Sequence, residues 1–396
     1  MRYFLTSDAV LRKLETPAVY QRATDELYEL DEDSFALLEK CSSESGESVE
    51  DADFAGYCVK EKILTTERVC RNRPPLKKSP DPSLRYLELQ ITDKCNLRCR
   101  HCYIAEGGGN ELSVPQIRDV LAEFEEMQGL RVLVSGGEPL LHSGFGELNA
   151  MLPDFSLRKV LFTNGLLLTD ELLEGLNVDE IQVSIDGLEE GHDALRGEGT
   201  FGRAIDSMRR SLERGFEVSV STMVHAANLD DFTGLERLFR SLGVKDWTVD
   251  VPCATGRLAG NEEYRVAPEE GGKYLAYGFG GGLHAGASGF ACGLHLMSVA
   301  ADGRASKCTF YAERPAGAIE EGLRKCWKRI RPLRLDELRC DCEEIEACRG
   351  GCRYRAETFG DPLGKDLYRC ALYDIMKKRG APGGGPDSRK KGGVSA

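Results

Sequence analysis

The chain has 396 residues, of which 41% are hydrophobic and 30% charged, so it can bury a sizeable core and is not globally disordered. Its net charge of −13 and its pI near 5.2 argue against a protein that coats nucleic acid. The longest apolar stretch falls well short of the ~18 residues that a membrane helix needs, and the first residues turn polar too early for a signal peptide. We therefore expect a cytoplasmic protein without a nucleic-acid or membrane partner.

Residues 1–67 form the first predicted unit, in which short β-type runs precede two helical stretches. The first helix is expected to begin after Asp33, and the second near Ser48, a candidate N-cap with Asp51 three residues on. This order of elements favours a small winged-helix-like α+β module. Residues 68–84, which are basic and contain four prolines, are predicted to be a linker.

Residues 85–265 alternate between strand-like and helix-like patterns. Six strands are predicted, at 86–92, 131–135, 159–163, 180–185, 217–222 and 247–251. Helical runs lie between them and begin at N-caps such as Ser113, Thr169 and Asn228. Strands that alternate with helices indicate βαβ units and a parallel sheet. Because the pattern shows no closing seventh or eighth strand, we expect the α/β class with a partial (β/α)6 barrel.

Residues 266–379 form a cysteine-rich region with few regular patterns. A hairpin is predicted around Asp302-Gly303, between strands at 296–299 and 305–308. The glycine-rich stretch 276–290 predicts no particular element. Residues 380–396 are of low complexity and are predicted to be disordered.

The chain has 15 cysteines, which in a reducing cytoplasm indicate metal ligation or catalysis rather than disulfides. Ten of them form two groups: Cys95, Cys99 and Cys102, then Cys292, Cys308, Cys340, Cys342, Cys348, Cys352 and Cys370. The scattered ones are expected to be inert core residues: Cys41, Cys58, Cys70, Cys253 and Cys326. Five histidines are expected to be structural or superficial: His142, His192, His225, His284 and His295.

The first cysteine group directly follows the first predicted barrel strand, in residues 95–102 (CNLRCRHC). Three thiolates can hold three irons of a [4Fe–4S] cluster and leave the fourth iron open for a small chelating molecule. The alternative is a zinc site with His101 as the fourth ligand.

The spacing Cys-x3-Cys-x2-Cys at the end of a first strand resembles the radical S-adenosylmethionine (SAM) superfamily. Three motifs at later strand ends match the pattern of that family: residues 135–139 (SGGEP), 163–165 (TNG) and 184–187 (SIDG). The resemblance implies a [4Fe–4S] cluster on Cys95, Cys99 and Cys102 whose open iron binds SAM. It also implies reductive cleavage of SAM to methionine and a 5′-deoxyadenosyl radical, which abstracts hydrogen from the substrate.

The same resemblance implies a set of SAM contacts: Gly136, Gly137, Glu138, Asn164, Ser184 and Arg196. The glycines would let the backbone approach the methionyl group, and Glu138 would accept a hydrogen bond from its ammonium. Ser184 and Arg196 would face the SAM carboxylate. No residue is assigned to the chemical step itself.

The second cysteine group resembles the SPASM extension of radical SAM enzymes, which carries up to two auxiliary [4Fe–4S] clusters. The resemblance implies that the nearer cluster uses Cys292, Cys308 and Cys352. The distal cluster would use the remaining four thiols, which are Cys340, Cys342, Cys348 and Cys370.

Seven ligands leave one iron of two clusters unligated, so either that iron is open or a further ligand exists. Cys253 and Cys326 are the spare thiols considered for it. The pair Cys340 and Cys342 departs from the common Cys-x2-Cys spacing, which leaves Asp341 or another oxygen ligand as an alternative. A zinc ribbon is the other interpretation of this region.

Residues 1–67 resemble, more loosely, the PqqD-like leader-peptide recognition element of the pyrroloquinoline quinone pathway. An edge strand there can accept a peptide strand. The alternative is a subdomain that only caps the bottom of the barrel. Residues 1–60 contain 14 acidic and 6 basic side chains, which disfavours DNA and suits a basic leader peptide.

These resemblances together predict a radical SAM/SPASM maturase that forms a crosslink, a thioether or an epimer in a precursor peptide. A flavodoxin- or ferredoxin-type protein is the implied electron donor. The alternatives are an enzyme of haem or tetrapyrrole chemistry, a sulfatase-type protein maturase, and a non-enzymatic iron–sulfur or zinc scaffold that binds peptide.

Overall fold

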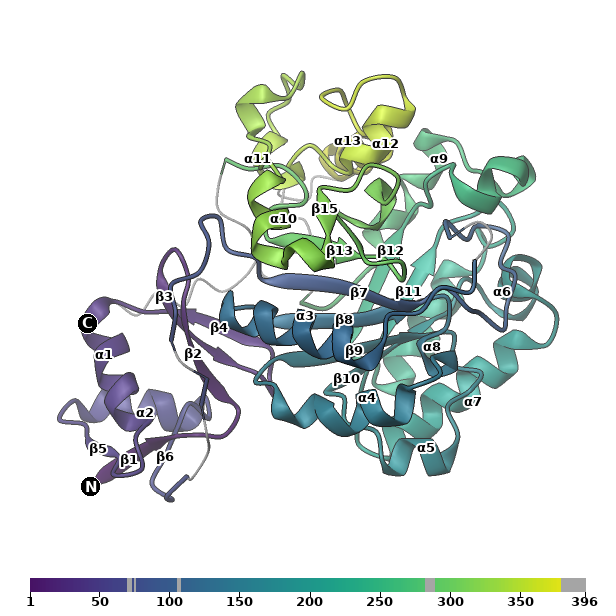
Figure 1. Cartoon of the computed structure of the whole chain (residues 1–396). Helices are drawn as coiled ribbons and strands as arrows, with labels where there is room; N and C mark the ends of the chain where they lie inside the picture. Colours follow the sequence, from purple (N-terminus) through teal and green to yellow (C-terminus); the bar gives the residue numbers. More distant parts are fainter. Residues whose placement is uncertain (70–72, 75, 105–107, 282–288, 379–396) are drawn as a thin grey trace.

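A nine-stranded sheet organises the computed structural model, which describes residues 1–69, 73–74, 76–104, 108–281 and 289–378 (Figure 1). Six of its strands are parallel and follow one another in chain order: β7 (Tyr86–Thr92), β8 (Arg131–Gly136), β9 (Arg158–Thr163), β10 (Glu180–Ser184), β11 (Glu217–Met223) and β12 (Asp246–Asp250). The predicted partial (β/α)6 barrel is therefore confirmed. The expectations for Cys70, for His284 and for the tail 380–396 lie outside the described residues.

The strands are connected by α3 (Val114–Glu126), α4 (Phe145–Met151), α5 (Asp170–Glu174), α6 (Glu189–Arg196), α7 (Thr200–Glu213) and α8 (Phe232–Leu242). The caps at Ser113 and Thr169 were predicted correctly, since each side chain accepts a hydrogen bond from a first-turn N–H. The expected cap at Asn228 is wrong. Asn228 lies before the helix, and its side chain instead bonds the backbone of His225, Asp186 and Met223.

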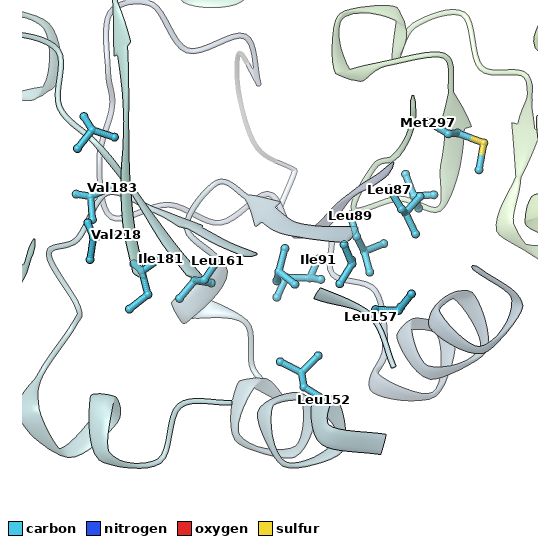
Figure 2. Packing of buried hydrophobic residues seen from close by; sticks show 14 of the residues in the cluster. Leu87, Leu89, Ile91, Leu152, Leu157, Leu161, Ile181, Val183, Val218 and Met297 are labelled. Atoms are coloured by element: carbon cyan, nitrogen blue, oxygen red, sulfur yellow. The ribbon is translucent and has the colours of Figure 1, made fainter. Parts of the chain in front are cut away.

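The two faces of the barrel strands carry different side chains. One face, which includes Leu87, Leu89 and Ile181, is apolar and packs with the helices in the largest buried cluster (Figure 2). The alternate positions, such as Glu88, Gln182 and Ser221, line a cavity on the inner side of the sheet. This period of two fixes which strand residues can serve a site.

The N-terminal residues form two small sheets and two helices. The elements are β1 (Arg2–Leu5), β2 (Ala9–Lys13), β3 (Pro17–Gln21), β4 (Glu26–Glu29), α1 (Glu32–Cys41), β5 (Glu47–Ser48), α2 (Ala52–Lys60) and β6 (Leu64–Thr65). The predicted start of α2 is wrong, because Asp51 caps that helix while Ser48 pairs with Arg2 in a sheet. Asp31 caps α1 one residue before the helix begins, so that helix also starts earlier than predicted.

The N-terminal module packs against the start of the barrel strands (Figure 1). Arg12 on β2 is fully buried and donates to the carbonyl oxygens of Gly129 and Ser156, at 3.1 and 2.7 Å. Asp25, in the turn before β4, pairs with Arg131 and Arg158, the first residues of β8 and β9. The module thus covers the end of the barrel opposite to the strand ends that carry the sequence motifs.

The cysteine-rich region adds strands to the sheet along the edge of β7 that does not pair with β8. It contains α9 (Pro268–Gly271), β13 (Leu296–Val299), β14 (Arg304–Ser306), β15 (Gly317–Ala318), α10 (Leu323–Arg329), α11 (Ile345–Cys348), α12 (Arg353–Thr358) and α13 (Leu367–Lys378). The predicted hairpin around Asp302-Gly303 is confirmed as β13 and β14. That β13 pairs in parallel with β7 was not predicted.

Short 3-10 turns complete the described elements: η1 (Pro139–Leu141), η2 (Leu152–Asp154), η3 (Gly256–Gly260), η4 (Glu262–Tyr264), η5 (Tyr274–Ala276), η6 (Thr309–Tyr311), η7 (Ile319–Glu321) and η8 (Leu335–Glu337). Among the described residues, no helix has both the length and the apolar character that crossing a membrane requires.

Arg158 ties the module to the barrel and should matter for stability. Its guanidinium is buried, donates to the carbonyl oxygen of Arg22 and pairs with Glu180 at 2.7 Å and with Glu217. We expect Arg158→Ala to lower the free energy of unfolding by about 3–5 kcal/mol, because the buried Glu180 carboxylate loses its cation. Chemical denaturation measures the change. Arg209→Ala, which removes an exposed pair with Asp206, is the control and should cost less than about 1 kcal/mol; equal losses would contradict the assignment.

Candidate functional site

A cavity of about 290 Å³ lies at the carboxyl ends of the barrel strands. Its lining brings together most of the residues that the sequence motifs single out, which are Cys95, Cys99, Cys102, Gly136, Gly137, Asn164, Ser184 and Arg196. The carboxyl ends of parallel strands are where such folds place their sites. Glu138 is not among the lining residues, and its side chain is fully buried.

The three thiols of the first group border the cavity, so the residues present fit a cluster that faces it. Within the described residues, no three His, Cys, Asp or Glu side chains converge closely enough to hold a single metal ion. The Nε2 atom of His101, the alternative zinc ligand, lies 3.6 Å from the Asp186 carboxylate.

The guanidinium of Arg196 lies beside one of the thiols. The Nη1 atom of Arg196 donates to the Sγ atom of Cys99 at 3.9 Å. Burial raises the pKa of the Cys99 thiol, and the charge of Arg196 opposes that rise. Because iron is bound by thiolates, a neighbouring guanidinium favours the form of Cys99 that can bind it.

Close backbone packing explains the two glycines of the SGGEP motif. The amide of Gly137 donates to Thr92 O and that of Glu138 to Lys94 O, both at 2.8 Å. A Cβ atom on Gly136, whose φ is +150°, would lie 2.3 Å from Thr92 O, and one on Gly137 would lie 2.4 Å from Lys94 O. The glycines therefore allow this turn to pack on the segment just before Cys95, a reason that the resemblance did not supply.

Glu138 joins the second motif to the third. Its carboxylate accepts hydrogen bonds from Thr163 Oγ1 and from the amide of Asn164, at 2.9 Å each. Burial raises the pKa of Glu138 to about 7, although these hydrogen bonds lower it. Its contact with the SAM ammonium stays a prediction.

Asn164 is held in turn by the cysteine loop, since its Nδ2 atom donates to Asn96 Oδ1 at 2.7 Å. Its predicted contact with SAM also stays a prediction. Asn96 was not singled out from the sequence, and its place inside the cysteine motif is the signal that could have found it.

Asp186 is the centre of a buried polar cluster. It accepts from Arg196 Nε at 2.5 Å and from the Met223 amide at 2.7 Å. Burial alone would raise its pKa, but the Arg196 guanidinium holds the pKa of this carboxyl well below its usual range. Arg196, predicted to face the SAM carboxylate, thus lines the cavity while its Nε is engaged by Asp186.

Three histidines surround Asp186, and two of them are His192 and His225, which were expected to be structural or to lie at the surface. His192 Nδ1 accepts from the Asp186 amide at 3.1 Å, and His225 Nε2 lies 2.9 Å from the Asp186 carbonyl oxygen. Burial lowers the pKa of His101 and of His192 to about 4, which keeps both neutral near pH 7. The contacts of His192 and His225 with the backbone of Asp186 agree with a structural role.

Glu88 on β7 is a cavity residue that the sequence did not single out. Its carboxylate accepts from Ser135 Oγ at 3.4 Å and from Thr309 Oγ1, both neutral donors. Burial raises the pKa of Glu88. A lone acidic residue between Leu87 and Leu89 in a buried strand was the available signal, since alternation directs it away from the apolar face.

The thiols of the second cysteine group act on one another in two subsets, and their division between two clusters stays a prediction. Burial raises the pKa of the Cys308 thiol to about 12, with a smaller contribution from the neighbouring thiols of Cys292 and Cys352. Burial and then Cys348 and Cys340 raise the pKa of Cys370 to about 11.

One cysteine of that group and the alternative oxygen ligand beside it remain to be described. Cys342 is exposed. The carboxylate of Asp341 is also exposed and lies 3.7 Å from Lys365 Nζ. Both roles in the distal cluster, the predicted one and the alternative, stay predictions.

Comparison with known proteins gives the class of the central domain. Residues 89–239 match the family described as Radical SAM superfamily, so the chain contains a radical SAM domain. An AdoMet-dependent heme synthase from Nitratidesulfovibrio vulgaris is 28% identical over 197 residues, 48% of this chain and 54% of that protein. The mycofactocin maturase MftC of Mycobacterium tuberculosis is 28% identical over 321 residues, 70% of this chain and 80% of that protein.

Among solved structures, Streptococcus suis SuiB bound to its precursor peptide SuiA superimposes with a TM-score of 0.66 at 15% identity. The match covers 93% of this chain and 100% of SuiB. At that identity the likeness establishes the fold alone, and the expected fold class is confirmed. The chain spans about half the length of the haem synthase relatives it matches.

The packing of Gly137 can be tested without knowledge of a substrate. We expect Gly137→Ala to lower the free energy of unfolding by about 1–3 kcal/mol, because its Cβ must displace Lys94 O. It should also lower the iron retained after reconstitution, since the displaced segment leads into Cys95. Gly202→Ala in α7, where an added Cβ meets nothing within 4 Å, is the control. A Gly137 variant as stable and as rich in iron as this control would contradict the packing argument.

Proposed function

We propose that the chain is a radical SAM enzyme that modifies a precursor peptide by hydrogen abstraction at the barrel mouth. The observation that carries the proposal is the convergence of four separate motifs on one cavity with three thiols at its border. When bound, a [4Fe–4S] cluster and SAM supply a one-electron reduction that releases methionine and a 5′-deoxyadenosyl radical.

The residues of the chain position and protect that chemistry. Cys95, Cys99 and Cys102 hold the cluster, and the guanidinium of Arg196 offsets the negative charge at Cys99. Apolar side chains such as Phe162 and Phe310 line the cavity and exclude water. Glu88 lies in the same cavity and offers a carboxylate to a hydrogen-bond donor of the substrate.

Two kinds of observation favour a peptide as the substrate. The relatives include a protein named a maturase, and the structural neighbour SuiB was solved with a precursor peptide. In addition, the N-terminal module offers a strand edge. β4 is the outer strand of the sheet β2-β3-β4.

The hydrogen-bond pattern shows which groups of β4 face outward. The amide of Leu30 donates to Pro17 O on β3 at 2.8 Å. Because inward and outward groups alternate along an antiparallel strand, the amides of Leu27 and Glu29 point away from β3. A peptide strand can therefore pair with β4 by β-augmentation.

A small apolar pocket lies beside this edge. It is about 40 Å³ in volume, and its lining includes Tyr28, Leu38, Phe54 and Ile63. Acidic residues border it, among them Glu29 and Asp31. We propose that a leader peptide pairs with β4, places one apolar side chain in the pocket and sets basic side chains against these carboxylates.

Tetrapyrrole chemistry is the second candidate. Some of the relatives, which the chain matches over about half of their length, are named AdoMet-dependent heme synthase. A strand edge with an adjoining pocket has no evident use in that chemistry. Binding of a peptide to the N-terminal module therefore discriminates between the two candidates.

An assay of 5′-deoxyadenosine formation tests the radical chemistry. The reconstituted full chain, reduced with dithionite in the presence of SAM, should form it, and the triple variant Cys95→Ala/Cys99→Ala/Cys102→Ala should not. The double variant Cys41→Ala/Cys58→Ala, which changes two buried thiols of the N-terminal module, should retain the activity. Formation at the wild-type rate in the triple variant would overturn the site.

Peptide recognition is tested on the full chain with short peptides encoded beside its gene. We expect a micromolar Kd for one of them, about −8 kcal/mol. Glu29→Pro removes one outward amide of β4 and should weaken that binding about fivefold to tenfold, as the loss of about 1 kcal/mol implies. Fluorescence polarisation with a labelled peptide measures the Kd.

The matched control is Glu32→Pro, which removes an acidic residue at the first position of α1, where proline is tolerated. It should leave the Kd unchanged. Equal Kd values for the two variants would contradict pairing at β4, and no binding of any such peptide would leave the module as a cap of the barrel.

A further inference from the structure

One thiol outside the predicted ligand set lies beside the nearer auxiliary group. Cys253 follows β12 by three residues and is buried, with 3% of its surface exposed. Its segment is bonded to the segment of Cys352, because the hydroxyl of Tyr354 donates to Thr255 Oγ1 at 3.4 Å. It also lines the cavity that Cys95, Cys99 and Cys102 border.

A buried ion-pair network fixes this contact. Arg355, near the start of α12, donates to Asp250 Oδ1 at 2.6 Å and to Val251 O at 2.9 Å, both just before Cys253. The same guanidinium pairs with Asp366 at 2.9 Å. Asp366 in turn accepts from the amide of Cys352 at 2.7 Å. The end of β12 and the start of α12 are thus held together, with one cysteine on each.

The other spare thiol lies elsewhere. Cys326 is buried in α10, and its Sγ atom donates to Ala318 O at 3.4 Å. Of the two thiols considered from the sequence, Cys253 is the one whose segment is bonded to the segment of a predicted ligand, Cys352.

We propose that Cys253 is the fourth thiolate ligand of the nearer auxiliary cluster, together with Cys292, Cys308 and Cys352. The proposal rests on the cluster assignment of the proposed function. Four cysteine thiolates satisfy the four irons of a [4Fe–4S] cluster. The nearer cluster then has no open iron to bind a substrate, so its role is to carry electrons next to the radical cavity.

The test uses the triple variant Cys95→Ala/Cys99→Ala/Cys102→Ala as background, so that only auxiliary clusters remain. Into it we introduce Cys253→Ala or, as the control, Cys326→Ala, which removes an equally buried thiol. Each protein is reconstituted with iron and sulfide and oxidised mildly with ferricyanide. EPR spectroscopy then measures the [3Fe–4S] signal, which a cluster gains when an iron without a thiolate ligand is lost.

We expect the Cys253 variant to show a [3Fe–4S] signal well above that of the background and to lose the matching iron, while the Cys326 variant equals the background. Far-UV circular dichroism checks the fold, and Cys253→Ser, close in size, replaces the alanine variant if that one does not fold. Identical signals for Cys253 and Cys326 variants that contain iron would overturn the proposal alone. Absence of iron from the background protein would overturn the auxiliary clusters as well.

Discussion

The close approach of the Gly136–Gly137 turn to the end of β7 is the constraint on which the site depends. It places backbone amides on Thr92 O and Lys94 O, the last acceptors before Cys95, and tolerates no side chain at either glycine. Glu138 and Asn164 extend the same connection to the third motif and back to Asn96. The cysteine loop is therefore positioned by three strand ends at once, which is what a rigid cofactor site requires.

A second buried connection joins the fourth motif to the thiols through Arg196. Asp186 binds Arg196, and Arg196 reaches Cys99, so the fourth motif also acts on the thiols. Arg355 plays the comparable part for the cysteine-rich region, where it joins β12 to α12. In both places one buried arginine donates to groups from separate segments, a carboxylate and a thiol in the first case and two carboxylates in the second. Each arginine thus links parts of the chain that are distant in sequence.

Much of the barrel could be predicted from the sequence, because its strands are short apolar runs and its helices begin at clear caps such as Ser113. The motif residues were also found, since their spacing after each strand is visible. The predictions that failed concern features that depend on tertiary contacts. The pairing of β13 with β7 joins segments about two hundred residues apart. The histidines around Asp186 come from three separate segments, one of which is helix α6. Asn228 was mistaken for a cap because its side chain bonds the backbone of the preceding loop and of the distant residue Asp186 instead.

The central claim is that the thiols of Cys95, Cys99 and Cys102 hold a cluster with an open iron that binds SAM. EPR spectroscopy of the reconstituted, reduced full chain, recorded before and after SAM is added, tests it most directly. The account predicts that SAM shifts the signal of one cluster in the wild-type chain and shifts none in the variant that lacks the three thiols. A wild-type chain that is rich in iron but whose spectrum SAM does not change would contradict it.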